Sequence, residues 1–306
     1  MKPAYDVEGK VVLITGAARG IGAQTARVLA ERGATLALVG LEPDNLATVA
    51  KELGPQHLWR ELDVTDQDAT DRVVAEVAEQ LGGIDVVMTN AGVGSYGTVR
   101  QIDPAAFQRV IDINLTGMFR TAHSALPHVI ERRGYILVVS SLAAFSPIAG
   151  MAAYDASKSG VEAFALAMRQ ELLHLGVDVG ICHPSWVDTD LVRNAEADLP
   201  SFKETRSKLP WPANSTTSVE DCATMIADGI ASRARRIYVP KSVVAAMLMR
   251  SLTGSGFAER LVRRQLARAV PRLEADAAAL GRPSNTSTIR HSDSDHPSSG
   301  HTPRQT

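Results

Sequence analysis

The sequence predicts an α/β protein with a doubly wound, seven-stranded parallel sheet, helices on both faces and a helical C-terminal extension. Two observations lead to this fold class. Short β-branched or aliphatic runs alternate with longer amphipathic segments over the first 240 residues, as they do in parallel sheets that helices cover on both faces. A glycine-rich stretch, TGAARGIG, directly follows the first of these runs, at the kind of strand-to-helix turn where such folds bind ligands.

Seven apolar runs are predicted to be strands, and we expect right-handed crossover helices to join them. The first run, VVLIT, is short and almost wholly apolar, as a buried central strand should be. The predicted strands are residues 11–15, 36–39, 57–62, 84–89, 135–140, 178–182 and 235–239. The predicted helices end at Arg32, then span about 43–53, 66–81 and 103–131, and the following one holds Lys158.

Two regions depart from this alternation. Residues 190–217 form a polar insertion with three prolines, just past the sixth strand's carboxyl end, where α/β proteins bind ligands. Residues 241–280 alternate apolar and arginine-rich patches with helical periodicity, and residues 281–306 are poor in apolar side chains and predicted to be disordered. We therefore expect a catalytic domain over 1–240 with a substrate loop at about 190–217, then a helical extension and a tail.

The extension at 241–280 has three candidate roles: a cap on the substrate pocket, part of a dimer interface, or a helix on a membrane surface. Its arginines and apolar residues, as in FAERLVRRQLARAV, suit a helix at a membrane interface. They equally suit a packed amphipathic helix, which is the interpretation that we favour.

Composition excludes several other classes of protein. The chain has 306 residues and a formal net charge of −2, whereas a nucleic-acid-binding protein normally carries a basic footprint. The two cysteines, Cys182 and Cys222, lack metal-ligand spacing, so we predict reduced thiols and no metal site. No signal-peptide h-region and no run of about 18 apolar residues occurs, and the cytoplasm is therefore the expected compartment.

The glycines of TGAARGIG have a specific use. Gly16, Gly20 and Gly22 would let the backbone turn tightly and approach a pyrophosphate, toward which the next helix points its N-terminal amides. This context, after a strand and at the start of a helix, is the one that distinguishes a dinucleotide site from a chance glycine pattern. The first 240 residues are thus predicted to form a Rossmann-type dinucleotide-binding domain.

Further motifs occur in order along the chain. Asp63 and Val64 close the third strand, Asn90-Ala91-Gly92 follow the fourth, and residues 183–189 read HPSWVDT. Between them lie Asn114, Ser141 and the stretch Tyr154-Asp155-Ala156-Ser157-Lys158, with Ser141 thirteen residues before Tyr154. This combination, over about residues 8–240, resembles the short-chain dehydrogenase/reductase family, in the short single-domain branch with TGxxxGIG and YxxxK motifs.

The resemblance implies an NAD(P)-dependent oxidoreductase that interconverts an alcohol and a ketone or aldehyde. It implies four catalytic residues: Asn114, Ser141, Tyr154 and Lys158. It implies that the cofactor contacts Gly16, Arg19, Gly20, Ile21, Gly22, Leu41, Asp63, Val64, Asn90, Ala91, Gly92, Tyr154, Lys158, Pro184, Val187 and Thr189.

The catalytic roles follow from the chemistry of carbonyl reduction. Tyr154 would be the general acid for reduction and the general base for oxidation, and Lys158, one helical turn away, should lower the pKa of its hydroxyl from about 10. The resemblance also implies that Lys158 binds the nicotinamide ribose and that Asn114 holds a water molecule of a proton relay. Ser141 would hydrogen-bond the substrate oxygen. Asp155, Ala156 and Ser157 are expected to be surface or packing residues.

The end of the second strand decides between the two nicotinamide cofactors. NAD-binding members usually place an acidic residue there, whereas this chain has Gly40 and Leu41, with Glu42 just beyond. Arg19 resembles the basic residue that NADP-binding members use against the 2′-phosphate. We therefore favour NADP(H), and NAD(H) is the alternative if Glu42 turns inward.

The substrate is predicted to be a medium-sized or large apolar alcohol or ketone. Trp186, Phe202, Trp211 and Met247 are the expected pocket walls. The resemblance implies a homodimer or homotetramer built on the fourth helix and the Tyr154-bearing helix. Two alternatives stay open: an epimerase or dehydratase on the same fold, and a nucleotide-sensing protein without catalysis.

Overall fold

The parallel sheet is the framework of the molecule. The computed structural model describes residues 6–209, 214–253 and 255–281. Seven strands, all parallel, lie in the order β3-β2-β1-β4-β5-β6-β7, which confirms the predicted fold class. The strands are β1 (Val11–Thr15), β2 (Thr35–Gly40), β3 (Leu58–Glu61), β4 (Val86–Thr89), β5 (Tyr135–Val139), β6 (Asp178–Pro184) and β7 (Arg236–Val239).

Helices cover both faces of this sheet. One apolar core lies between the sheet and the helices α1 (Gly20–Glu31), α2 (Pro43–Leu53) and α9 (Val219–Ala231). A second core lies on the opposite face, under α3 (Gln67–Leu81), α4 (Pro104–Ile111), α5 (Gly117–Glu131) and α6 (Ala152–Leu172). Because the central strands are buried on both faces, they are continuous apolar runs rather than alternating ones.

The order of the strands fixes where a ligand can bind. The chain builds β1, β2 and β3 outward to one edge and then returns to place β4 beside β1. The loops after β1 and β4 therefore diverge to opposite faces, and a crevice opens at the carboxyl ends of these two strands.

The helix predicted over 103–131 is interrupted. It begins at Pro104, with Asp103 accepting a hydrogen bond from Ala105 N at 2.9 Å, and its middle is a π-helical turn, η1 (Asp112–Thr116). α5 continues from Gly117, whose Cα packs so closely on Val64 that an added Cβ would lie 2.6 Å from Val64 Cγ2. The helix predicted over 103–131 is thus confirmed in extent, with a π-helical turn in its middle that the sequence did not predict.

The substrate loop predicted at 190–217 is largely helical. It forms α7 (Asp190–Asp198) and α8 (Pro200–Ser207), and the first leads directly into the second at Leu199. Phe202 is buried, so the insertion packs as a small layer over the end of the sheet rather than as an open loop. Trp211, predicted as a pocket wall, lies outside the described residues.

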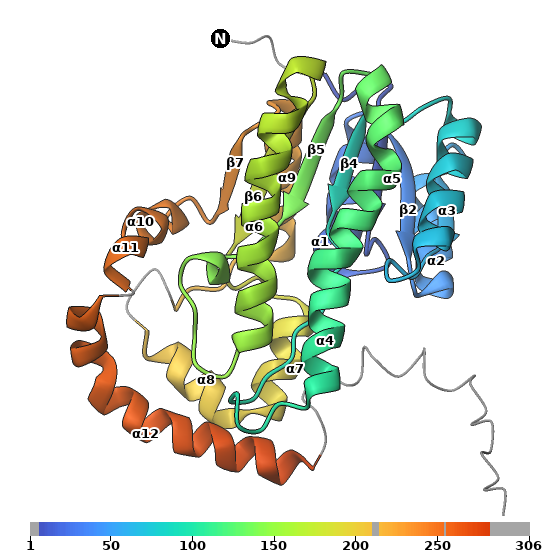
Figure 1. The fold of residues 1–306 in the computed structure, drawn as a ribbon. Helices are drawn as coiled ribbons and strands as arrows, with labels where there is room; N and C mark the ends of the chain where they lie inside the picture. The colour runs from blue at the N-terminus through green and yellow to red at the C-terminus, as the bar shows by residue number, and fades with distance from the viewer. Residues whose placement is uncertain (1–5, 210–213, 254, 282–306) are drawn as a thin grey trace, which may run out of the picture.

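The C-terminal extension consists of helices. α10 (Val243–Leu248) and α11 (Arg250–Thr253) follow β7, and the long α12 (Gly256–Leu280) then runs across α8 and α7 (Figure 1). The two remaining elements of the described residues are short 3₁₀ turns: η2 (Leu142–Ala144) after β5 and η3 (Leu173–Leu175) after α6. The tail predicted to be disordered lies, from residue 282 on, outside the described residues.

Candidate active site

A cavity of about 460 Å³ lies at the carboxyl ends of the strands. The segments that follow β1 to β6 all contribute to its lining, as the topology requires. Of the residues predicted to bind a cofactor, all but one line it: Gly16, Arg19, Gly20, Ile21, Leu41, Asp63, Val64, Asn90, Ala91, Gly92, Tyr154, Lys158, Pro184, Val187 and Thr189. Ser141 also lines the cavity, whereas Gly22 and Asn114 lie behind its wall.

The glycine-rich loop is shaped by its backbone and by packing. Gly16 and Gly20 have φ values of +64° and +57°, in the left-handed region that favours glycine. Gly22 has another use, because a Cβ there would overlap Gly16 O and lie 2.8 Å from Asn90 Nδ2. Gly22 therefore brings the first turn of α1 onto the loop, and this packing role was not distinguished from ligand contact in the sequence.

The Asn90-Ala91-Gly92 segment ties β4 to β1. The Asn90 amide group donates to Thr15 O at 3.0 Å and to Gly16 O at 3.2 Å. The Thr15 hydroxyl accepts from the backbone N–H groups of Asn90 and Ala91, each at 3.0 Å. These bonds hold the two loops that border the crevice in a fixed relation, so the nucleotide end of the cavity is rigidly built.

Tyr154 and Lys158 lie side by side at the start of α6. Lys158 Nζ is 5.6 Å from the centroid of the Tyr154 ring and donates to Val139 O at 2.9 Å. Lys158 is buried, and this burial lowers the pKa of its ammonium to about 8. Because neutral lysine costs less to bury than the ammonium, this lysine can exchange a proton near neutral pH.

The pKa of Tyr154 differs from the sequence-based expectation. Burial raises it to about 12, and a hydrogen bond with Ser141 opposes this rise. Among the protein's own groups, desolvation of the buried phenolate dominates, so the net direction is opposite to the expected lowering.

Ser141 is held at the end of β5. Its hydroxyl accepts from Ala143 N at 3.2 Å, as the N-cap of η2, and lies 3.4 Å from Pro184 O, to which it donates. These contacts fix the hydroxyl between the Tyr154 side chain and the segment after β6.

Asn114 sits in the π-helical turn and bonds fully to protein groups. Its Oδ1 accepts from Val93 N at 2.8 Å, and its Nδ2 donates to Val93 O at 2.9 Å and to Ser157 Oγ at 3.0 Å. A Cβ added at Gly92 would lie 3.2 Å from Asn114 Oδ1 and 3.5 Å from Lys158 Nζ, so the three groups adjoin. The side chain thus joins the loop after β4 to α6. π-helical turns recur at functional sites, but the sequence carried no signal for this one.

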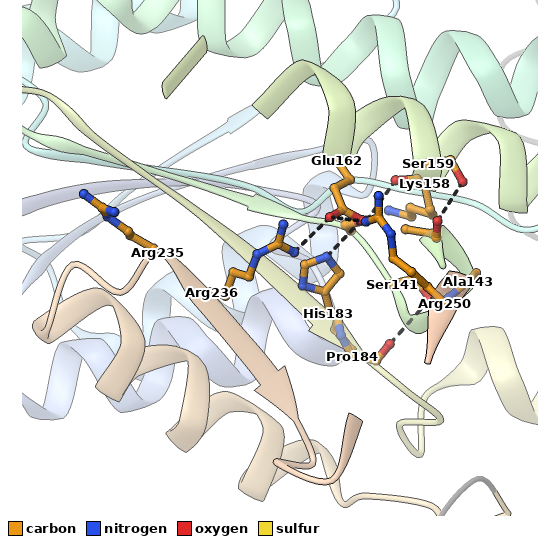
Figure 2. A network of polar contacts seen from close by, with 12 residues as sticks. Ser141, Ala143, Lys158, Ser159, Glu162, His183, Pro184, Arg235, Arg236 and Arg250 are labelled. Atoms are coloured by element: carbon orange, nitrogen blue, oxygen red, sulfur yellow. Dashed lines mark hydrogen bonds and ion pairs between the residues drawn. The ribbon is translucent and has the colours of Figure 1, made fainter. Parts of the chain in front are cut away.

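A buried charged network that the sequence analysis missed lies behind Lys158 (Figure 2). Glu162, one turn further along α6, pairs with Arg236 of β7 at 2.9 Å and with Arg250 of α11 at 3.7 Å. His183 Nε2 lies 3.5 Å from Glu162 Oε2. Hydrogen bonding to His183 and Arg236 lowers the pKa of Glu162 to about 2, and burial lowers the pKa of His183. The i, i+4 spacing of Lys158 and Glu162 was the available clue.

The substrate end of the cavity is apolar. Tyr96, Met151 and Trp186 line it and pack with Phe202, whose ring centroid lies 5.2 Å from that of Tyr96 and 5.6 Å from that of Trp186. Phe202 therefore packs behind the cavity wall to which Trp186 belongs. Met247, the other predicted wall residue, is on α10 and does not line the cavity.

Asp155 and Ser157 prove to be packing residues. Both are buried; Asp155 Oδ2 accepts from Ile148 N at 2.9 Å, and Ser157 Oγ donates to Tyr154 O at 2.7 Å. Burial raises the pKa of Asp155 to about 7. Asp155 thus anchors the segment before α6 that forms part of the substrate end.

Arg19 is engaged by two carboxylates at the nucleotide end. Its Nε donates to Glu42 Oε1 at 2.9 Å, and its Nη1 lies 3.5 Å from Asp190 Oδ2. Glu42 also lines the cavity, beside Leu41. The Glu42 carboxylate, which also accepts from Asn45 Nδ2 at 2.7 Å, is therefore held by Arg19 at this end of the cavity.

Two exclusions hold for the described residues. None of their helices is long and apolar enough to span a membrane. Within the same ranges, no group of three or more His, Cys, Asp or Glu side chains could hold a metal ion, and Cys182 and Cys222 are buried free thiols.

Comparisons with known proteins identify the family. The family model described as short chain dehydrogenase matches residues 10–200, and the chain belongs to this family. It is 33% identical over 246 residues to an 11-beta-hydroxysteroid dehydrogenase of Pinus massoniana, covering 77% of this chain and 68% of the relative. It is 33% identical over 223 residues to a cis-4-hydroxycyclohexanecarboxylate dehydrogenase of Sinomonas cyclohexanicum, covering 72% and 90%.

A third similarity extends further along the chain. An oxidoreductase named SadH from Mycobacterium tuberculosis is 33% identical over 270 residues, covering 86% of this chain and 98% of the relative. Since residues 1–240 are only about 78% of the 306, this match must include part of the C-terminal helices. Family membership makes the protein an NAD(P)-dependent oxidoreductase that acts on CH–OH groups.

Proposed function

We propose that this protein interconverts an apolar, medium-sized to large secondary alcohol and its ketone, with Tyr154 as the general acid and base. One observation carries the proposal: Tyr154, Ser141 and Lys158 line the same cavity as the glycine-rich loop. The substrate oxygen would bond to the Ser141 and Tyr154 hydroxyls at the point where the nucleotide and apolar ends meet.

The nucleotide end fits a dinucleotide on its own geometry. Gly16 and Gly20 turn in the left-handed region, and the cavity beside them continues past Asp63 and Asn90 to Lys158. Gly16, Gly20 and Ile21 would hold the pyrophosphate, Asp63 and Val64 the adenine, and Val187 and Thr189 the nicotinamide end. The bound NAD(P) accepts or supplies the hydride.

The remaining steps belong to this chain's side chains. In reduction, Tyr154 donates its hydroxyl proton to the substrate oxygen while Ser141 Oγ donates a hydrogen bond to the same oxygen. Lys158 stabilises the tyrosinate that forms and, with a pKa of about 8, can return the proton to it. Asn114 keeps the loop after β4 fixed beside Lys158, and we retain the relay water as part of the proposal.

The cofactor preference rests on Arg19 and Glu42. A 2′-phosphate would have to compete with Glu42 and Asp190 for the Arg19 guanidinium, whereas the Glu42 carboxylate can accept hydrogen bonds from the ribose hydroxyls of NAD. These contacts weaken the argument for NADP(H) that Arg19 alone provides, and they move our proposal toward NAD(H).

Two relatives suggest the shape of the substrate. The names of the Pinus and Sinomonas enzymes specify alcohols on alicyclic rings. A flat apolar wall of Tyr96, Met151 and Trp186 suits the face of such a ring, so we propose an alicyclic secondary alcohol as the substrate class.

A direct spectrophotometric assay tests this function. The purified protein is mixed with NADH or NADPH and a panel of cyclic, linear and sugar ketones, and absorbance at the reduced-nicotinamide band is followed. Turnover of cyclic apolar ketones is expected. Cofactor binding by calorimetry without turnover of any ketone would favour the nucleotide-sensing alternative, and activity confined to small polar sugars would contradict the proposed substrate class.

Self-association is proposed through α5 and α6. Phe119 of α5 is 42% exposed and lies edge-on to Phe164 of α6, with the ring centroids 5.8 Å apart. An exposed aromatic side chain near the start of one helix, packed on a half-buried one of another, is typical of a surface that packs against a copy. Sedimentation of wild type and Phe119→Asp tests whether this dimer forms.

Peripheral membrane contact is proposed for residues 244–268. Six of the ten exposed large apolar side chains among the described residues lie here: Val244, Leu248, Met249, Leu261, Val262 and Leu266. Residues 241–268 carry six basic residues and one acidic residue, in a chain of net charge −2. This combination suits an anionic lipid surface. Co-sedimentation with phosphatidylglycerol vesicles, but not with phosphatidylcholine vesicles, is the expected result.

A further inference from the structure

Beside Trp186, three separate segments line or back the wall at the substrate end of the cavity. They are residues 96–101 after β4, residues 148–151 before α6, and the pair α7–α8. None of them belongs to the sheet. Gly97 N donates to Gly150 O at 2.9 Å, which joins the first two segments, but this bond does not reach α8. The wall therefore needs another element to fix its shape.

One stretch of α12, residues 272–277, contacts all three segments; we call it the α12 clasp. Leu273 of the clasp is only 7% exposed and is buried in the same apolar cluster as Tyr96, Met151 and Trp186. Its Cδ2 packs directly on the backbone of Gly150. Leu273 itself does not line the cavity, so it supports the wall from behind.

Polar bonds attach the clasp to residues 98–101. Glu274 Oε1 accepts from Thr98 Oγ1 and Glu274 Oε2 from Arg100 Nη2, each at 2.9 Å. The backbone oxygen of Glu274 accepts from Gln101 Nε2 at 2.8 Å. Three hydrogen bonds on one residue hold this loop to α12.

A second set of bonds attaches the clasp to α8. Asp276 Oδ2 accepts from Ser201 N at 2.8 Å, which satisfies an N–H group that the first turn of a helix leaves without an intrahelical acceptor. Arg272 Nη1 lies 3.3 Å from Glu204 Oε2. The clasp therefore fixes where α8 begins and, through it, the Phe202 ring behind Trp186.

The rest of α12 shows that this packing is local. Every side chain from Arg260 to Arg268 is exposed, whereas Leu273 and Ala277 pack on the apolar cluster. We propose that the α12 clasp sets the size and shape of the substrate end, with Leu273 as a positioning residue that determines specificity through Tyr96, Met151 and Trp186. This inference rests on the proposed alcohol dehydrogenase function.

Leu273→Ala tests the apolar part of the clasp. The space left behind the wall lets Met151 and Trp186 move outward, so the ratio of kcat/KM for bulky over small cyclic alcohols should rise by about tenfold, while the dissociation constant of the cofactor stays unchanged. Leu261→Ala is the matched control, since Leu261 is on the same helix but 68% exposed. An unchanged ratio in Leu273→Ala contradicts the inference.

Native-state proteolysis gives a readout that needs no substrate. Glu274→Ala removes two bonds to residues 98–101 and Asp276→Ala the bond to α8. Glu274→Ala should speed trypsin cleavage at Arg100, and Asp276→Ala should speed cleavage in α8 at Lys203, Arg206 and Lys208, with the Leu261→Ala control unchanged. Unchanged cleavage in both variants overturns the clasp. A wild type that reduces none of the ketones would refute the proposed function and leave this measurement intact.

Discussion

The two ends of the cavity are built in different ways. The nucleotide end comes from loops that directly follow β1, β2, β3 and β4, each anchored to the sheet. The substrate end comes from connections and helices outside the sheet, held together by α12. The end that is anchored to the strands keeps its geometry when surface segments vary. The end that is assembled from loops can change its shape when a single contact with a distant segment is lost.

This difference separates binding from selection. Substitutions at the nucleotide end should weaken cofactor binding and leave the substrate preference unchanged. Substitutions behind the substrate end should change the substrate preference and leave cofactor binding unchanged. Tyr154 lies where the two ends meet, and its loss should stop turnover without weakening either end. Four substitutions test whether the two ends are independent.

Tyr154→Phe should lower kcat by about 10²–10⁴-fold, because the general acid is removed, and leave the calorimetric affinity for the cofactor within about twofold. The matched control is Tyr135→Phe, which removes a hydroxyl bonded to Ala234 O at 2.7 Å, away from the cavity. Turnover that survives Tyr154→Phe would refute its assigned role.

Gly22→Ala should weaken cofactor binding by about tenfold and destabilise the fold by about 1–3 kcal/mol, because the added Cβ would overlap Gly16 O. Gly256→Ala is a suitable control, since a Cβ there meets nothing within 4 Å. Calorimetry and thermal melting measure both effects. Substrate preference should not change; a changed preference would mean that the two ends are not independent.

Glu162→Gln should destabilise the protein by about 1–3 kcal/mol at neutral pH, because it weakens charge-assisted bonds behind Lys158. The folded-state pKa of Glu162 is about 2, below its ordinary 4.5. Its contribution is therefore complete above pH 4.5 and is lost as pH falls toward 2. The melting temperatures of wild type and variant should converge over that window, whereas the exposed-site control Glu79→Gln should show no such gap. A constant gap down to pH 2 would contradict this assignment.

Glu42→Gln should have the smallest effect: a shift of about tenfold in kcat/KM toward NADPH over NADH. The neutral amide frees Arg19 from its ion pair for a 2′-phosphate. Arg19→Gln should shift the preference in the opposite direction. Substrate preference measured with either cofactor should stay the same. If neither variant changes the preference for NADPH over NADH, residues other than Arg19 and Glu42 determine the cofactor.

The sequence by itself determined the fold class, the family and most of the nucleotide end. Apolar strand runs, the glycine positions and the spacing of Tyr154 and Lys158 are local patterns, and each one is set by neighbours along the chain. Sixteen of the predicted catalytic and cofactor-binding residues, from Gly16 to Thr189, line one cavity. Local signals reach this far because a parallel sheet brings the carboxyl ends of its strands together.

Only the tertiary structure decided the rest. The raised pKa of Tyr154, the pairing of Arg19 with Glu42 and the network around Glu162 depend on burial and on partners distant in the chain, such as Arg236, 74 residues from Glu162. The packing of Leu273 against Gly150 joins positions that no motif relates. Motifs record which chemistry a strand end can offer, but the shape of the substrate end is a property of long-range packing, which one sequence does not encode in any local pattern.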